Sequence, residues 1–159
     1  MNTQDFAGHE SFPAIGGIQI QPLQVLIAED DEADAYLIHQ ALQASPIVGG
    51  IAIARDGEEA LTLMRSGGIR PDLAIVDLNM PRKGGMGLLV DFACGGWGRF
   101  PVAVLTSSKS SIDLCRARLR GAHAIITKPD TQEELAEVLD GLVASALTIS
   151  LERDRDKGR

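Results

Sequence analysis

A short apolar run that ends on a carboxylate is the feature that most constrains the fold of this chain. Leu73–Val76 contains only apolar residues, which is typical of a strand buried on both faces of a sheet. The run ends at Asp77, and Pro81 and a group of glycines then force a turn. Open α/β sheets bind ligands at the carboxyl ends of their strands. Taken alone, Asp77 is better explained as a residue that caps a loop. A functional role for it is inferred because other predicted strands also end in polar residues.

Four more short apolar runs predict strands, and segments with helical spacing separate them. Right-handed crossovers would place the C-terminal ends of all five strands at one edge of the sheet. The sequence therefore predicts an α/β fold with a doubly wound, five-stranded parallel sheet. Gly49 and Gly50 are predicted to end the first helix, and Asp56 to cap the second. The other predicted strands are 23–28, 51–54, 102–105 and 124–126, and the predicted helices include 33–44, 86–93 and the segment after the capping box at 131–134.

The chain is expected to form one domain between two loose ends. Residues 1–22 contain several glycines, prolines and polar residues, which predicts a flexible leader. Residues 23–147 carry the predicted strands and helices. Residues 148–159 are predicted to be a charged C-terminal tail, frayed from Glu152 onward.

Charge and hydropathy exclude several functional classes. A net charge of -7 without a basic stripe argues against nucleic-acid binding. No apolar segment approaches the roughly 20 residues needed to cross a bilayer, and no signal peptide is recognised. Cys94 and Cys115 lack a CxxC spacing, which indicates reduced thiols. A cytoplasmic protein without a membrane partner is therefore expected.

Polar residues follow four of the five predicted strands. Glu29 and Asp30 follow the first, Asp77 the third, Thr106 the fourth and Lys128 the fifth. Three neighbouring carboxylates repel one another and call for a cation, and an oxygen-only set favours Mg²⁺. With Mg²⁺ bound, a carboxylate oxygen can attack a phosphoryl group. Thr106 can donate a hydrogen bond to that group and Lys128 can offer a positive charge.

With these motifs in place, the sequence resembles the receiver domain of two-component response regulators. The matching pieces are VLIAEDD, ARDGEEAL, AIVDLNMPRKGG, VAVLTSS and IITKP, in the order of the family and together spanning residues 23–147. The resemblance implies a flavodoxin-like fold with strand order 2-1-3-4-5. It also implies Mg²⁺-dependent transfer of a phosphoryl group from a sensor histidine kinase. Within the family, the chain resembles the small regulators that are paired with phytochrome-type sensor kinases.

The resemblance assigns a role to each site residue. Asp77 matches the phosphoacceptor, Asp30 a direct metal ligand and Glu29 its acidic partner. Asn79 stands where a backbone carbonyl completes the metal shell. The remaining matches are Thr106 and Lys128 as the stabilising hydroxyl and lysine, and Ser107 and Ser108 as residues that tune access to the phosphoryl group.

Two positions depart from the pattern of the family. Ile125 stands three residues before the lysine, where receivers usually carry a Tyr or Phe that switches rotamer, and this puts that form of signalling in question. Gly84 replaces an aspartate that is common before the loop glycine. Ile125 is instead predicted to support an apolar output face. That face would contact a downstream protein or form a homodimer, extended by Leu147, Ile149 and Leu151.

The resulting prediction is a stand-alone response regulator that catalyses only its own phosphorylation and dephosphorylation. One alternative is a phosphohydrolase of the haloacid dehalogenase type. Its DxDxT signature would need an Asp and a Thr where this chain has Asn79 and Pro81. The other alternative is a receiver-like binding module that is never phosphorylated.

Overall fold

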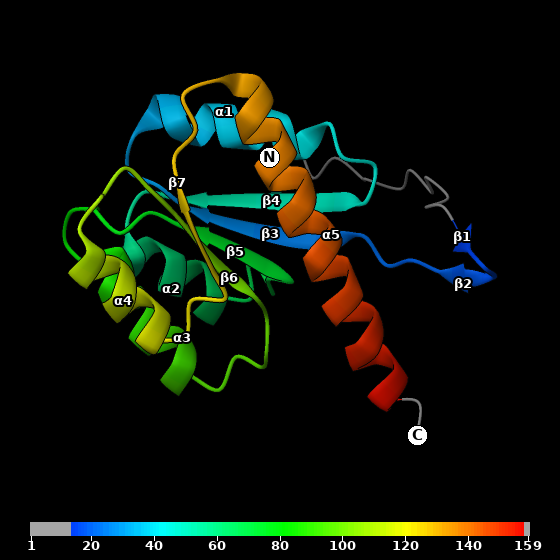
Figure 1. The fold of residues 1–159 in the computed structure, drawn as a ribbon. Coiled ribbons are helices and arrows are strands. Elements are labelled where there is room, and N and C mark those ends of the chain that lie inside the picture. The colour runs from blue at the N-terminus through cyan, green and yellow to red at the C-terminus, as the bar shows by residue number, and fades with distance from the viewer. Residues whose placement is uncertain (1–13, 158–159) are drawn as a thin grey trace, which may run out of the picture.

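The fold is a parallel sheet covered by helices on both faces, followed by a long C-terminal helix (Figure 1). A computed structural model describes residues 14–157. The elements in chain order are β1 (Ala14–Ile15), β2 (Ile18–Gln19), β3 (Leu23–Ala28), α1 (Glu32–Gln43), β4 (Val48–Ala54), α2 (Gly57–Arg65), β5 (Leu73–Val76), α3 (Gly85–Cys94), β6 (Val102–Thr106), α4 (Ser111–Leu119), β7 (Ala124–Thr127) and α5 (Gln132–Lys157).

The main sheet has five strands in the order β4-β3-β5-β6-β7, and all neighbouring pairs are parallel. Counted along the chain, this order is 2-1-3-4-5, so the predicted α/β class and strand order are confirmed. The register pairs Ala28 with both Ala54 and Val76, and Thr106 with Thr127. The C-terminal ends of these strands therefore lie together at one edge of the sheet.

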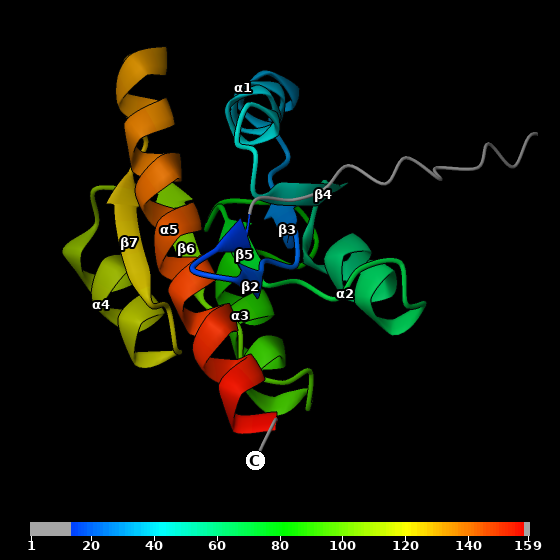
Figure 2. The same cartoon turned by 90° about the vertical axis from the view of Figure 1, so that its right-hand side faces the viewer.

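Alternation along the strands divides the core into two layers. In β3, Leu26 and Ala28 pack with α2, α3 and α4, whereas Val25 and Ile27 pack with α1 and α5. β5 is buried at all four positions, as predicted from its unbroken apolar run. The two groups of helices on opposite faces of the sheet are visible in Figures 1 and 2.

Side-chain caps are present at the starts of α2, α4 and α5, and those of α2 and α5 were predicted. The side chains of Asp56 and Ser110 accept hydrogen bonds from the third residue beyond them, at the beginning of α2 and α4. Thr131 accepts one from the N–H of Glu134 at the start of α5, over 3.2 Å. These polar residues satisfy amide groups that the first helical turn leaves without backbone partners.

The helix end predicted at residue 44 is correct to within one residue, but the role predicted for Gly49 and Gly50 is wrong. α1 ends at Gln43, and Gly49 and Gly50 lie inside β4 rather than in a connection. A side chain at position 49 would collide with Pro22, and one at position 50 with Gln24, because the neighbouring chain passes close to this part of β4. Close approach of Pro22, and not a turn, explains Gly49, whereas at position 50 the near atoms belong to the end of the flexible Gln24 side chain.

The predicted frayed tail is also wrong up to Lys157, where α5 ends. Arg153 attaches this end of the helix to the sheet layer, because its guanidinium hydrogen-bonds Asp72 and the carbonyl of Arg99. Ser150, one turn earlier, is buried. The end of α5 therefore packs against the protein despite its charged sequence.

The predicted leader is only partly described. Residues 14–19 form the β1–β2 hairpin, and Ile20 is buried, so the stretch before β3 is structured in this part. Residues 1–13 lie outside the described range. Within residues 14–157, none of the helices has the length and apolar character required to cross a membrane. Both cysteines are free, and both are exposed.

Candidate functional site

Backbone hydrogen bonds between neighbouring strands position the acidic residues. The N–H of Glu29 donates to the carbonyl of Ala54 and the N–H of Asp77 donates to the carbonyl of Ala28, each over 2.9 Å. These bonds continue the strand pairing by one residue beyond the apolar runs. Glu29 and Asp77 are consequently held in register at the edge of the sheet.

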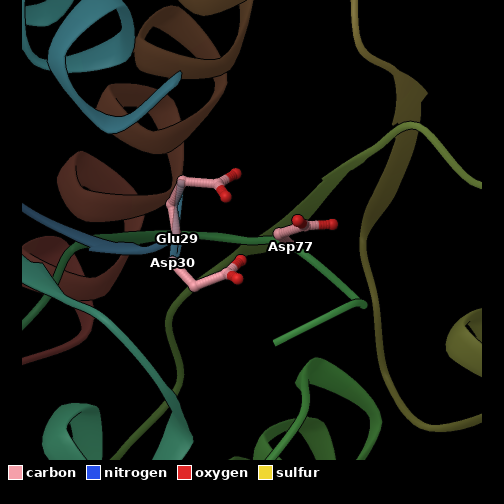
Figure 3. Close-up of side chains that lie close together, drawn as sticks. All are labelled: Glu29, Asp30 and Asp77. Atoms are coloured by element: carbon pink, nitrogen blue, oxygen red, sulfur yellow. The ribbon is translucent and has the colours of Figure 1, made fainter. Parts of the chain in front are cut away.

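Three carboxylates meet at this edge (Figure 3). Glu29, Asp30 and Asp77 each offer an oxygen, and these oxygens lie within 4.8 Å of one another. Glu29 and Asp77 are buried, whereas Asp30 is exposed. The spacing and the oxygen-only chemistry fit a hard divalent cation that retains part of its water shell.

Lys128 lies beside the cluster and connects it to the last strand. Its N–H donates to the carbonyl of Thr106 over 2.9 Å, which fixes the backbone at the end of β7. Its ammonium nitrogen lies 2.8 Å from Glu29 and 3.4 Å from Asp77. It also lies 2.7 Å from Asp34, in the first turn of α1. The sequence analysis did not include Asp34 in the site.

Burial dominates the electrostatics of Glu29. It raises the pKa of this carboxyl to about 7, because the charged form loses hydration, and hydrogen bonds from Lys128 and the N–H of Asp31 only partly offset the effect. For Lys128, burial acts to lower the pKa, but hydrogen bonds to Asp34 and Glu29 outweigh it and raise the pKa above its ordinary value. Lys128 is therefore a permanent positive charge beside the carboxylates.

Thr106 is fully buried at the end of β6. Its hydroxyl oxygen accepts a hydrogen bond from the N–H of Ser108 over 3.2 Å, which orders the loop after the strand. Ser107, between them, is exposed, and Ser108 is half-buried. Thr106 and Lys128 thus occupy neighbouring strand ends, as their places in the sequence predicted.

The loop after Asp77 is attached to the beginning of α2. Arg82 has a φ of 59°, in the left-handed region, and its Nε donates to Asp56 over 2.7 Å. The carbonyl of Lys83 accepts a hydrogen bond from the N–H of Gly57 over 2.8 Å. A Cβ at position 57 would lie 2.8 Å from that same carbonyl oxygen, so the contact requires glycine. These two contacts fix the course of the loop.

Two of the other predicted positions are placed as follows. The N–H of Asn79 lies 3.4 Å from a carboxylate oxygen of Asp77, so the residue is adjacent to the cluster. Ile125 is half-buried and packs against the layer formed with α2, α3 and α4. It lies on β7, the strand that leads to Lys128.

Sequence reasoning missed Asp34 and Arg82. Asp34 lies in the first turn of α1, four residues after Asp30, and was left out of the predicted site. Its closeness in sequence to the acidic pair Glu29 and Asp30 is the signal that could have found it. Nothing in the sequence around Arg82 indicates its pairing with Asp56, because the pairing depends on how the loop crosses α2.

A five-stranded parallel sheet with an acidic cluster, a buried threonine and a paired lysine at its C-terminal edge defines a class of signalling domain. Residues 25–140 match the response regulator receiver domain. The chain belongs to this family, as its motifs suggested.

Individual relatives agree with this assignment. Response regulator Rcp1 of Synechocystis is 30% identical over 127 residues, which cover 76% of this chain and 86% of Rcp1. The probable methanogenesis regulatory protein FilR2 of Methanothrix harundinacea is 34% identical, with 75% of this chain and 80% of FilR2 covered.

Solved structures show the same likeness. The phosphorylated cyanobacterial phytochrome response regulator RcpA has a TM-score of 0.70 at 30% identity, covering 76% of this chain and 90% of RcpA. The Mn²⁺-bound form of Rcp1 has a TM-score of 0.68 at 30% identity, covering 76% of this chain and 91% of Rcp1.

Proposed function

We propose that this protein is a response regulator that accepts a phosphoryl group on Asp77 from a phosphohistidine of a sensor kinase. The observation that carries the proposal is the placement of Asp77. Its carboxylate is buried at the end of the central strand, beside two further carboxylates and the ammonium group of Lys128. The likeness to Rcp1 and RcpA supports a kinase of the phytochrome type as the donor.

In the proposed reaction, a carboxylate oxygen of Asp77 attacks the phosphorus atom of the donor. The new oxygen–phosphorus bond forms as the phosphorus–nitrogen bond to the kinase histidine breaks, and the electron pair of that bond returns to the imidazole nitrogen. Lys128 offsets the charge on the phosphoryl oxygens, and the hydroxyl of Thr106 donates to one of them. Ser107 and Ser108 are small, so they leave the incoming group access to Asp77.

Glu29, Asp30, Asp77 and the backbone carbonyl of Asn79 would hold the Mg²⁺ ion. When bound, the ion supplies positive charge that offsets the repulsion among the carboxylates and polarises the phosphoryl group. The Mn²⁺-bound form of Rcp1 supports a divalent cation in a protein of this kind.

The proposed output is protein–protein contact through one face of the molecule. This output face consists of α4, β7 and the neighbouring part of α5. Ile112 and Leu119 on α4 are 62% and 82% exposed, and Ile125 on the neighbouring strand β7 is half-buried. Exposed apolar side chains of this size favour a protein partner, either a downstream protein or a second copy of the chain.

Intact mass after incubation with acetyl phosphate and Mg²⁺ tests the proposed function. The wild type should gain one phosphoryl group, and the gain should require Mg²⁺. Asp77→Asn should abolish it while the fold persists, because asparagine has nearly the shape of aspartate. Asp113→Asn, at a half-exposed position on α4, is the matched control and should be labelled like the wild type. Full labelling of Asp77→Asn would contradict the assignment, and an unlabelled wild type would favour a binding module.

A further inference from the structure

The ammonium group of Lys128 has its shortest contact with helix α1, not with Asp77. The nitrogen lies 2.7 Å from Asp34, 2.8 Å from Glu29 and 3.4 Å from Asp77. Asp34 is 94 residues from Lys128 along the chain. An ammonium group has three donors, so three carboxylates account for all of them. In this structure Asp34 and Glu29 both lie closer to the ammonium group than Asp77 does.

The first turn of α1 contains other acidic residues besides Asp34, but their side chains have other partners. The N–H of Asp34 donates to the side chain of Asp31 over 2.9 Å, so Asp31 is occupied as the helix cap. The Glu32 side chain is 83% exposed and lies 3.6 Å from Arg55. Asp34 is the acid of this turn that contacts Lys128.

The three partners of the lysine differ in their access to water. The side chains of Glu29 and Asp77 are 2% and 8% exposed, whereas that of Asp34 is 40% exposed. A phosphoryl group on Asp77 would add anionic oxygens beside the lysine, so one carboxylate would have to give up its hydrogen bond. Asp34 gives it up at the smallest cost, because water can hydrate the released carboxylate.

We propose that Asp34 is a positioning residue that holds Lys128 in the unphosphorylated protein and competes with the phosphoryl group for its ammonium. This inference rests on the proposed function of Asp77. Asp34 restrains the reaction in two ways: it holds the lysine on the side of α1, and it adds a negative charge near the incoming phosphate. Phosphorylation of Asp77 would then release Asp34 and change the contacts at the beginning of α1.

The experiment compares the wild type with Asp34→Asn, Asp34→Glu and Glu32→Gln. The first readout is the rate of mass gain with acetyl phosphate and Mg²⁺. The second is the side-chain NMR resonance of Lys128 in the unphosphorylated protein, which reports its contacts independently of the reaction. Glu32→Gln removes one negative charge from the same helical turn without touching the lysine, so it controls for charge alone.

Asp34→Asn should be phosphorylated about threefold to tenfold faster, as expected for the loss of one partly solvated charge interaction. It should also shift the Lys128 resonance. Asp34→Glu should restore both values toward the wild type, and Glu32→Gln should leave both nearly unchanged. An unaltered resonance and rate in Asp34→Asn, or an equal acceleration in Glu32→Gln, would overturn the inference. A wild type that gains no phosphoryl group would instead contradict the proposed function, and the resonance would still decide whether Asp34 holds the lysine.

Discussion

Glu29 and Asp30 are adjacent in the sequence and both carry a carboxylate, but their surroundings differ. Glu29 is buried and hydrogen-bonded to Lys128, whereas Asp30 is exposed and forms one corner of the carboxylate cluster. Substitution of Asp30 should therefore alter cation binding without disturbing the core.

Asp30→Asn should weaken Mg²⁺ binding by about tenfold or more, because it removes one charged oxygen ligand from the cluster. Calorimetric titration measures the affinity directly. Glu32→Gln, which removes one negative charge as Asp30→Asn does but lies outside the cluster, should bind Mg²⁺ almost as well as the wild type. Equal affinities for Asp30→Asn and the wild type would exclude Asp30 as a ligand.

At the scale of elements, the loop after β5 depends on the first turn of α2. Asp56 caps that helix and pairs with Arg82, and it is almost completely buried. Its hydrogen bond from the N–H of Glu59, opposed in part by burial and assisted by Arg82, lowers the pKa of its carboxyl below the ordinary value. A lowered pKa in the folded state stabilises the protein above the pKa of the unfolded chain, and this contribution is lost as the pH falls through the folded-state value.

Asp56→Asn should lower the free energy of unfolding at neutral pH, because asparagine keeps the cap but loses the charge that faces Arg82. The difference from the wild type should shrink on acidification, once the wild-type carboxyl is also neutral. Urea unfolding across a pH series gives both quantities. Asp140→Asn, at an exposed position of α5, should show no such trend. A difference that is independent of pH would mean that the charge of Asp56 contributes nothing.

The end of α5 depends on Arg153. Arg153→Ala should release the last two turns of the helix and cost about 1 kcal/mol, the usual contribution of a partly exposed hydrogen bond to a charged group. Hydrogen exchange should then become faster at residues 151–157. Arg155→Ala is the control, because Arg155 is exposed. Unchanged exchange in Arg153→Ala would show that apolar contacts alone hold the helix end.

Most elements could be predicted because their patterns are local. Apolar runs mark β3, β5, β6 and β7, and side-chain caps mark the starts of α2 and α5. The wrong predictions share a cause, because each depends on a contact with a residue distant in sequence. Pro22 and Gln24 lie against Gly49 and Gly50, and Asp72 binds Arg153 near the end of α5. The same holds for the site. The residues at the strand ends could be predicted from the sequence, whereas the contact between Asp34 and Lys128 depends on how α1 packs.

At the scale of the whole molecule, the two faces of the sheet are covered by different helices, which expose different side chains. α1 and α5 cover one face, and α2, α3 and α4 cover the other (Figure 1). α4 buries only Ala117 of its nine residues and leaves Ile112 and Leu119 exposed. The proposed output face therefore carries apolar side chains that a partner chain could cover.

Phosphorylation should promote self-association through the output face, and Leu119→Asp should prevent it by placing a charge in the contact. Light scattering before and after treatment with acetyl phosphate and Mg²⁺ measures the mass of the particle. Tyr36→Ser, at an exposed aromatic on α1, is the control for loss of apolar surface. A wild type that is monomeric in both states would rule out the homodimer and leave a different downstream protein as the partner.

The attachment of Arg153 to Asp72 has a practical consequence for biosensor design. Asp72 precedes Asp77 by five residues, so at about 3.3 Å per residue of strand the two lie about 17 Å apart. The last turns of α5 are thus fixed at the end of the sheet remote from the carboxylates. A fluorophore on Lys157 would occupy a defined position without obstructing the phosphodonor, and with a second dye on α1 it would convert movement of that helix into an optical signal.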